Sequence, residues 1–383
     1  MKTIVYKLMI VFSVFLVFTA CKEDMGKINS KLSAVQTLND PANAATIVLQ
    51  PSASASLYFD WDPCAVESSG TAMYQIAFDK PDGDFSNPVY VITSDGHGYQ
   101  NAATITHKLM NKIAGMMGIG PSETGTFKWT VFSTKGMQIM KAAQEFTISI
   151  TRLAGFDNVP IDVYVTGDGS EGGSDLSKAQ KMKALGEGAF ETYTKLAAGE
   201  AFYFTDGISG TPRQFYTEDG LVKQDGTTTV ATGGIYNITL DFTTGACTYT
   251  LVESIGFYFC PDDAILFELP YIGNGVFQAV NQTVNFSQQS WGLDQRYKFR
   301  MFVKTNGGAD PEQEYEWATL NQTDSPPNAS SPASYYYLEL LTNPNDIDQW
   351  DNKWKLMDQF NGTVATYTVY LQADQPYTHS VTQ

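Results

Sequence analysis

The sequence is poor in histidine, cysteine and basic residues, and each shortage argues against a class of function. Its 3 histidines are scattered, and the Cys/His spacing of a zinc site is missing. With 24 lysines and arginines against 41 aspartates and glutamates, the net charge is -17. This charge argues against nucleic acids and polyanionic glycans as ligands, because their negative charges require a basic surface. Nucleophile elbows, phosphate-binding loops and EF-hand loops are missing too. The sequence therefore predicts no enzyme, no metal and no cofactor, and it leaves neutral ligands open.

The N-terminus predicts export to a membrane. Lys2 and Lys7 supply positive charge, and residues 8–18 are almost wholly apolar. This run is shorter than the roughly 20 residues that cross a bilayer, and it fits the core of a signal peptide. It ends in Phe18-Thr19-Ala20-Cys21, which resembles a bacterial lipobox, so Cys21 is expected to carry lipid and to become the mature N-terminus. The alternative is an ordinary signal peptide cut nearby, with Cys21 incidental.

The residues after Cys21 predict where the anchored protein goes. Lys22, Glu23 and Asp24 follow directly, and a lysine with two acids at this place resembles the surface-export signal of Bacteroidetes lipoproteins. The alternative is a solvated run of charges. Residues 22–44 are polar and lack periodicity, which predicts a flexible tether. We expect a lipid-anchored outer-membrane protein that faces the cell exterior.

Three cysteines remain after lipidation, Cys64, Cys247 and Cys260. An odd number leaves at least one of them unpaired within a monomer. Cys247 and Cys260 flank a domain boundary and are one candidate disulfide. Buried free thiols are the preferred interpretation, because cysteine is among the residues most often buried.

Strand patterns dominate the rest of the chain and predict an all-β protein. Residues 45–152 contain short aromatic strands with period-2 alternation. One helix is predicted after Thr104 or Thr106, ending near Gly118. This pattern is typical of an immunoglobulin-like or fibronectin-III-like sandwich. Two tryptophans of this domain are expected in its core, Trp61 and Trp129.

Two further modules look like copies of each other: module 2, residues 153–254, and module 3, residues 255–383. Four segments recur in the same order, which indicates an internal repeat. The pairs are Val163–Val165 with Phe257–Phe259, Gly186–Phe190 with Gly273–Phe277, Phe202–Phe204 with Tyr297–Phe299, and Tyr236–Leu240 with Tyr367–Leu371. Module 3 also carries an insertion, residues 305–349, and long loops on a sandwich are natural places for binding residues.

Short sequences spread over the whole chain carry a resemblance to a known family. They are Phe59-Asp60-Trp61 and Phe127–Val131 in the first domain, Val165–Asp168 and Phe190–Gly199 in module 2, and Ala373-Asp374 with Tyr377-Thr378-His379 at the end of module 3. Behind a lipoprotein signal, this order resembles the SusE/SusF group of Bacteroidetes surface lipoproteins that bind glycans. The resemblance implies carbohydrate-binding-like β-sandwich modules and a polysaccharide ligand, with starch as the founding example. It also implies a place beside a SusC/SusD-like transporter complex.

A sugar-binding module needs flat aromatic rings for the apolar faces of sugars and a few polar donors. The resemblance marks the lysine of an aromatic-Lys-aromatic strand, here Lys298, as a candidate donor. Arg300 lies two residues further on and therefore on the same strand face. Tyr315, Trp317 and Trp350 are the aromatic candidates, and Trp317 is expected to be exposed because acidic residues surround it.

These candidates also have plainer interpretations. A solvated strand face explains Lys298 and Arg300 as well as a sugar contact does. Packing around the strand of residues 354–357 explains Trp354 better than Trp350.

Module 2 fits the resemblance less well. It has Tyr203 at the lysine position and no tryptophan, and its weaker candidates are Arg213, Gln214 and Tyr216. We therefore predict a non-catalytic glycan-binding surface lipoprotein with module 3 as the main binder. The alternative is a structural or adhesive surface protein that binds a protein partner. Exposed aromatic residues in module 3 would favour the first, and their burial would favour the second.

Overall fold

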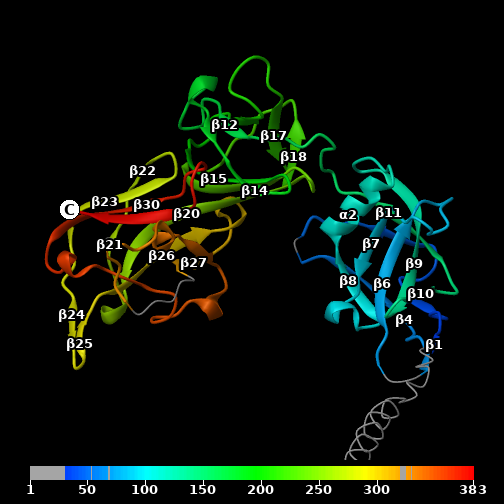
Figure 1. The fold of residues 1–383 in the computed structure, drawn as a ribbon. Coiled ribbons are helices and arrows are strands. Elements are labelled where there is room, and N and C mark those ends of the chain that lie inside the picture. Colours follow the sequence, from blue (N-terminus) through cyan, green and yellow to red (C-terminus); the bar gives the residue numbers. More distant parts are fainter. Residues whose placement is uncertain (1–30, 53, 68–69, 320–324, 329) are drawn as a thin grey trace, which may run out of the picture. The chain divides into compact units, whose positions relative to one another are not determined.

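The computed structural model describes residues 31–52, 54–67, 70–319, 325–328 and 330–383, and it confirms the all-β prediction. The chain forms two compact units, one ending at Arg152 and one spanning Leu153–Gln383 (Figure 1). Within the described part, no helix is long and apolar enough to cross a membrane.

The first unit is a sandwich of two main sheets. Its strands are β1 (Lys31–Leu32), β2 (Leu38–Asp40), β3 (Ala45–Val48), β4 (Ser56–Trp61), β5 (Val66–Glu67), β6 (Met73–Asp79), β7 (Tyr90–Thr93), β8 (Ala102–Thr106), β9 (Thr124–Lys135), β10 (Gln138–Lys141) and β11 (Phe146–Thr151). The larger sheet has the order β3-β11-β9-β6-β7, with β10 pairing the second half of β9. The smaller sheet has the order β2-β4-β8, and β1 pairs with β5.

Aromatic side chains join the two sheets of this unit. The ring of Phe59, from the smaller sheet, meets Phe78 and Trp129 of the larger sheet edge-to-face, with centroids 5.7 and 5.0 Å apart. Edge-to-face contacts of this kind add stability to the area that the rings bury. Trp61 and Trp129 have no exposed surface, so their predicted place in the core is confirmed.

The predicted helix is also confirmed. It is α2 (His107–Met116), and the Thr106 hydroxyl accepts a hydrogen bond from the Leu109 backbone N–H at 3.2 Å, as an N-cap should. The chain leaves the helix through Gly118, whose φ of +90° suits a glycine.

The predicted tether is wrong for its described part. Residues 31–44 include β1 and β2, and they bury Leu32, Val35 and Leu38 in the first unit. These few apolar residues are too widely spaced to give a periodic signal, but each meets a partner that is distant in sequence.

The second unit contains both repeated modules. The strands up to their junction are β12 (Tyr164–Thr166), β13 (Gln180–Lys181), β14 (Lys183–Gly186), β15 (Ala189–Leu196), β16 (Tyr203–Thr205), β17 (Gln214–Glu218), β18 (Leu221–Gln224), β19 (Gly234–Asp241) and β20 (Ala246–Phe259). The later strands are β21 (Ala264–Glu268), β22 (Tyr271–Gly273), β23 (Val276–Thr283), β24 (Ser287–Gln289), β25 (Gly292–Asp294), β26 (Arg296–Lys304), β27 (Glu312–Ala318), β28 (Glu339–Leu341), β29 (Trp354–Lys355), β30 (Val364–Tyr370) and β31 (Thr378–Thr382).

Strand order confirms the internal repeat. In module 2, β14-β15-β19 continues into the first half of β20, while β12-β16-β17-β18 forms the other side. In module 3, β22-β23-β30-β31 matches the first set, and the second half of β20 with β26-β27-β28 matches the second. The long strand β20 therefore belongs to both modules, and the predicted boundary after residue 254 falls inside it.

The second matching segment of each copy begins with a turn that has the same backbone conformation in both. Gly186-Glu187-Gly188 has φ values of +98°, +49° and +79°, and Gly273-Asn274-Gly275 has +110°, +49° and +71°. Three successive positive φ angles require glycine at the outer positions and tolerate Asn at the centre. This explains why the Gly-x-Gly pattern recurs in the sequence.

Short 3-10 helices lie between the strands. They are η1 (Gly96–Gly98), η2 (Leu176–Lys178), η3 (Cys260–Asp262), η4 (Asn306–Gly308), η5 (Ala333–Tyr336), η6 (Pro344–Asp346) and η7 (Asp358–Phe360). Cys64, Cys247 and Cys260 are all free thiols, so the candidate Cys247–Cys260 disulfide is not formed. Cys260 is fully buried, as the preferred interpretation expected, whereas Cys64 and Cys247 are partly exposed.

Candidate functional site

The polar face of β26 is buried. Lys298 has no exposed surface and Arg300 is almost covered, so the interpretation of a solvated strand face is wrong. The physical reason is the position of β26 between β20 and β27, with the segment of residues 342–353 lying over this face. Lys298 Nζ donates to the backbone oxygen of Asp348 at 2.7 Å and to Glu316 Oε1 at 3.1 Å. A side chain enclosed in this way does not contact a ligand directly, which corrects the prediction for Lys298.

Arg300 lies at the edge of the same charge cluster. Its Nη1 donates to Glu314 Oε1 at 2.5 Å and its Nη2 to the Asp348 backbone oxygen at 2.6 Å. Its guanidinium group also lies over the ring of Tyr258, 4.3 Å from the centroid, a favourable cation–π geometry. Arg300 thus lines a surface recess with part of its side chain. It also holds the segment of residues 342–353 in place through Asp348.

Glu316 is the buried acid of the cluster. Burial raises the pKa of its carboxyl to about 7, against the lowering effect of Lys298 and Arg300. Its Oε2 lies 3.1 Å from Arg300 Nε, so both carboxylate oxygens face a cation. Removing one partner of such a cluster is costly, because it leaves buried charge uncompensated.

Asp348 connects this buried cluster to the surface. Its backbone oxygen binds Lys298 and Arg300, and its carboxylate oxygen Oδ1 accepts from the backbone N–H groups of Trp350 and Asp351 at 2.7 Å each. The buried cations therefore hold the short turn that presents the Trp350 ring.

Two exposed tryptophans and an arginine form what we call the aromatic surface: Trp291, Arg296 and Trp350. Trp350 is 41% exposed and Trp291 is 63% exposed. The Arg296 guanidinium lies 4.3 Å from the centroid of Trp350 and 5.9 Å from that of Trp291. Its Nε donates to the buried carboxylate of Asp294 at 2.9 Å. Trp291 stands at the turn of the β24–β25 hairpin, which projects from the body of its unit in Figure 1.

A recess of about 460 Å³ is lined in part by Asp348 and Gln349, the two residues that precede Trp350. Tyr258 and Arg300 form part of its wall, and Gln349 is fixed by a hydrogen bond from Nε2 to the Cys260 backbone oxygen at 2.9 Å. The recess and the aromatic surface together offer flat rings, guanidinium donors and carboxylate acceptors, which is the chemistry that a sugar chain requires.

The prediction that Trp317 is exposed is wrong. Trp317 is 2% exposed, and its ring packs against Tyr193 and Tyr377 with centroids 6.2 and 5.8 Å apart. The register explains this burial: Phe299 pairs with Trp317 in module 3 as Phe204 pairs with Phe215 in module 2. Aligning the two copies of the repeat would have placed Trp317 at a core position.

Among the other aromatic residues considered, Tyr315 and Trp354 pack in the core, whereas Trp350 is partly exposed. Tyr315 is half-buried against the same core as Trp317, two residues away on the same strand face. Trp354 is fully buried and Trp350 is not, so the plainer interpretation holds for Trp354, as expected.

The sequence analysis missed Arg296. It precedes Lys298 by two residues, so the period-2 rule that placed Lys298 and Arg300 on one strand face includes it.

The weaker candidates of module 2 make contacts within the module. Arg213 Nε donates to Asp206 Oδ2 at 2.6 Å and Gln214 Nε2 to the Gly226 backbone oxygen at 2.8 Å. The Tyr216 ring packs so closely on Gly226 that a Cβ there would lie 2.6 Å from it. Arg213 therefore closes the connection between β16 and β17, while Gln214 and Tyr216 stabilise the β17–β18 hairpin.

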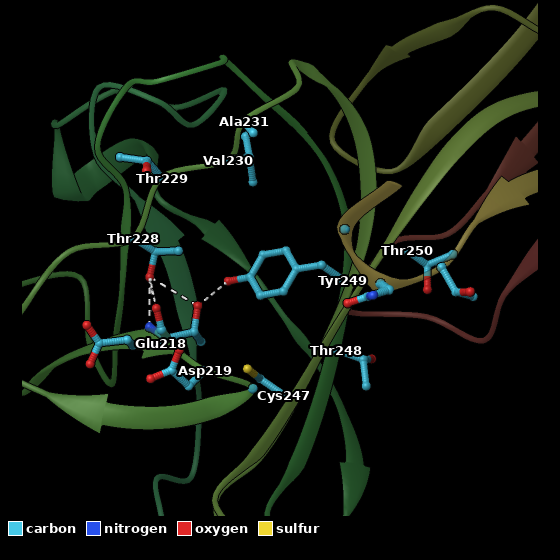
Figure 2. Close-up of a pocket in the computed structure, with 15 residues that line it drawn as sticks. Glu218, Asp219, Thr228, Thr229, Val230, Ala231, Cys247, Thr248, Tyr249 and Thr250 are labelled. Atoms are coloured by element: carbon cyan, nitrogen blue, oxygen red, sulfur yellow. Dashed lines mark hydrogen bonds between the residues drawn. The ribbon is translucent and has the colours of Figure 1, made fainter. Parts of the chain in front are cut away.

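Module 2 also borders a recess of about 530 Å³ that the sequence did not indicate (Figure 2). Figure 2 shows the Tyr249 side chain pointing toward the side of the recess where Thr228 lies. The hydroxyl oxygens of Tyr249 and Thr217 are 2.8 Å apart, and those of Thr217 and Thr228 are 3.1 Å apart. The hydroxyl groups of these three residues therefore find hydrogen-bond partners among themselves. Burial raises the pKa of the Cys247 thiol in the wall to about 11, so it stays protonated at neutral pH and is a poor nucleophile.

Cys21, Lys22, Glu23 and Asp24 lie outside the described residues. Among the residues that are described, no group of three or more His, Cys, Asp or Glu side chains could hold a metal ion.

Comparison with known proteins confirms the family resemblance over part of the chain. Residues 22–132 match the family model described as SusE outer membrane protein. No curated protein matches the chain. Among solved structures, the crystal structure of SusF from Bacteroides thetaiotaomicron is similar with a TM-score of 0.27 and 11% identity, over 91% of this chain and 76% of that chain.

Proposed function

We propose that this chain is an outer-membrane surface protein that binds a neutral polysaccharide without cleaving it, through the aromatic surface of module 3. The match of residues 22–132 to an outer membrane protein family supports the location. The observation that carries the binding proposal is the half-exposed Trp350 ring, stacked by Arg296 at 4.3 Å and held on a turn that the buried cations fix.

The geometry of this surface suits a sugar chain. The Arg296 guanidinium covers part of Trp350 and Asp294 orients it, so ring and donor are ordered before a ligand arrives, which reduces the entropy cost of binding. The recess with Arg300 and Tyr258 is lined by Asp348 and Gln349, the two residues before Trp350, so a chain of several sugar units is the ligand that would contact both. The net charge of -17 favours a neutral polymer over an anionic one.

The carboxylates of the recess support a non-catalytic role. Glu314 accepts from Arg300, and Asp263 accepts from the Tyr258 hydroxyl. Burial raises the pKa of Asp348, but backbone N–H donors and Lys298 lower it further, so the net pKa is below its usual value. A glycosidase acid instead needs a raised pKa and a facing carboxyl partner.

The lipid anchor at Cys21, the export signal of Lys22, Glu23 and Asp24, the exterior orientation and a SusC/SusD-like transporter partner belong to the same proposal. They rest on the sequence and on the family match. Mass spectrometry of the protein purified from membranes tests the anchor, because a lipidated N-terminus at Cys21 adds a fixed mass to a chain that begins there.

The alternative function is structural or adhesive. Burial of Trp317 and Trp354 favours it, since those rings stabilise the core rather than meet a ligand. Exposure of Trp291 and Trp350 favours the glycan.

Affinity electrophoresis distinguishes the two functions. The chain without residues 1–21 is run through native gels that contain neutral polysaccharides, beside Trp350→Ala and, as a matched exposed aromatic on the first unit, Tyr58→Ala. We expect one polymer to retard the parent and Tyr58→Ala. Trp350→Ala should bind it about 10–100-fold more weakly, since a stacked and buried ring contributes about 1.5–3 kcal/mol. Retardation that Trp350→Ala leaves unchanged would refute the site.

A further inference from the structure

The β9–β10 hairpin of the first unit presents an apolar tip to solvent. Met137, at its turn, is fully exposed, and Ile139 and Met140 are 65% and 40% exposed. Register extends the patch sideways: Ile139 lies opposite Thr134, which lies opposite Met73 on β6. Met73 and Ile139 thus share one face at this end of the larger sheet, while Met140 points to the opposite face and Met137 lies at the turn. Four exposed apolar residues at one end of a sheet are unusual, whereas single ones are ordinary on soluble proteins.

The charge around this tip differs from that of the rest of the chain. Residues 124–144 contain no aspartate or glutamate, although the protein has 41 of them. The same segment contains Lys128, Lys135 and Lys141. Lys128 and Lys141 share one acidic partner, Glu145, at 3.1 and 2.5 Å, so two of the three lysines have a single acid between them in these contacts. An apolar tip flanked by lysines is the composition of segments that lie in the interface of a bilayer with anionic lipids.

The hairpin lies where the chain enters the fold. The Leu32 backbone N–H on β1 donates to the Gln138 side chain on β10 at 3.2 Å, and the Ser133 hydroxyl donates to the Ser33 backbone oxygen at 3.1 Å. Figure 1 shows β1 and β10 at the same end of the unit, away from α2. Lys31 comes only ten positions after Cys21, and ten residues span at most about 36 Å.

We propose that the tip of the β9–β10 hairpin contacts the lipid bilayer that anchors the chain, and so fixes the orientation of the first unit on it. This inference rests on the proposed lipidation of Cys21. The short connection holds the tip at a high effective concentration near the bilayer, so a contact that is weak for the free protein is sufficient once the chain is anchored.

Methionine oxidation measures this contact. The lipidated full chain is placed in vesicles of phosphatidylethanolamine and phosphatidylglycerol and treated with a membrane-impermeant oxidant, and sulfoxide formation is followed by mass spectrometry. The reference is the chain without residues 1–21 in solution. We expect Met137 to oxidise several-fold more slowly on vesicles, and Met116 on α2, which is 47% exposed, to oxidise at an unchanged rate.

A matched pair of variants identifies the cause. Ile139→Asp places a charge in the tip at an exposed position and should restore fast oxidation of Met137 on vesicles. Ile161→Asp, at an isoleucine that is 89% exposed in the second unit, should leave the protection intact.

Equal oxidation of Met137 on vesicles and in solution overturns the proposal, as does protection that appears only when a protein partner is added. Intact mass shows separately whether Cys21 carries lipid. A chain without lipid that stays off the vesicles overturns this inference and the anchor, and leaves glycan binding by module 3 to its own test.

Discussion

Replacing Lys298 with methionine removes a buried cation while keeping most of the apolar stem. Glu316, which has no exposed surface, then loses the partner at 3.1 Å from Oε1 and keeps only Arg300 beside Oε2. Breaking a buried pair by removing one partner costs about 3–5 kcal/mol. Because Arg300 remains, we expect a loss near the lower end, about 3 kcal/mol of unfolding free energy.

The loss should depend on pH in a defined direction. Burial raises the pKa of Glu316 to about 7, above its ordinary value of 4.5. A folded chain that holds this proton more tightly than the unfolded chain loses stability as pH rises between these values. Without Lys298 the carboxylate is less favourable still, so the deficit of Lys298→Met should be small near about pH 5 and large near about pH 8.

Urea unfolding of the chain without residues 1–21, followed by tryptophan fluorescence, measures these differences. Lys304→Met is the control on the same strand, because Lys304 forms a half-exposed pair with Glu253 and such pairs contribute about 0–1 kcal/mol. The double variant Lys298→Met/Glu316→Leu should recover most of the loss, since it removes the buried carboxylate together with the lysine and leaves Arg300 paired with Glu314. A deficit equal at the two pH values, or equal in the single and double variants, would refute the reasoning.

Two further predictions concern buried rings. Trp317→Ala should destabilise the second unit by about 3–5 kcal/mol, because it empties a core position, whereas Trp350→Ala should change its stability by less than about 1 kcal/mol; thermal unfolding compares the two. His379 donates from Nδ1 to the Tyr336 backbone oxygen and accepts from the Tyr297 hydroxyl at Nε2, and burial lowers its pKa to about 3. The His379 contribution to the unfolding free energy should therefore be constant above about pH 6.5 and fall by up to about 1.4 kcal/mol per pH unit below it. The difference between the parent and His379→Gln, in urea titrations at several pH values, isolates this contribution because Glu316 is present in both chains.

Local patterns in the sequence were enough for the parts of the fold that depend on local contacts. The cap at Thr106, the glycine at Gly118 and the paired Gly-x-Gly turns each follow from backbone preferences. The repeat was visible because both copies must bury the same strands. Candidate glycan residues were harder to place, because their exposure depends on segments that are distant in sequence.

The burial of Trp317 and Glu316 could not be predicted from the local sequence. The run Glu314-Tyr315-Glu316-Trp317 suggested a solvated loop, yet its alternation is also a strand pattern with both aromatics on one face. The acidic face would normally be exposed. It is buried here because residues 342–353 return over β26, and no local signal shows that Asp348 will bind Lys298 and Arg300.

The junction of modules 2 and 3 gives the second module a role that does not require a ligand. Strand β20 runs through both modules, and Trp317 packs between Tyr193 of module 2 and Tyr377 of module 3. The Tyr271 hydroxyl adds a hydrogen bond to the Tyr193 backbone oxygen at 3.2 Å. A continuous strand and a shared aromatic core leave little freedom for a hinge, because packed interiors do not deform continuously. Module 2 therefore supplies one side of the core against which module 3 packs. Strand β27 rests on this core through Trp317 and places Glu316 beside Lys298. The order of the Trp350 turn thus depends on module 2.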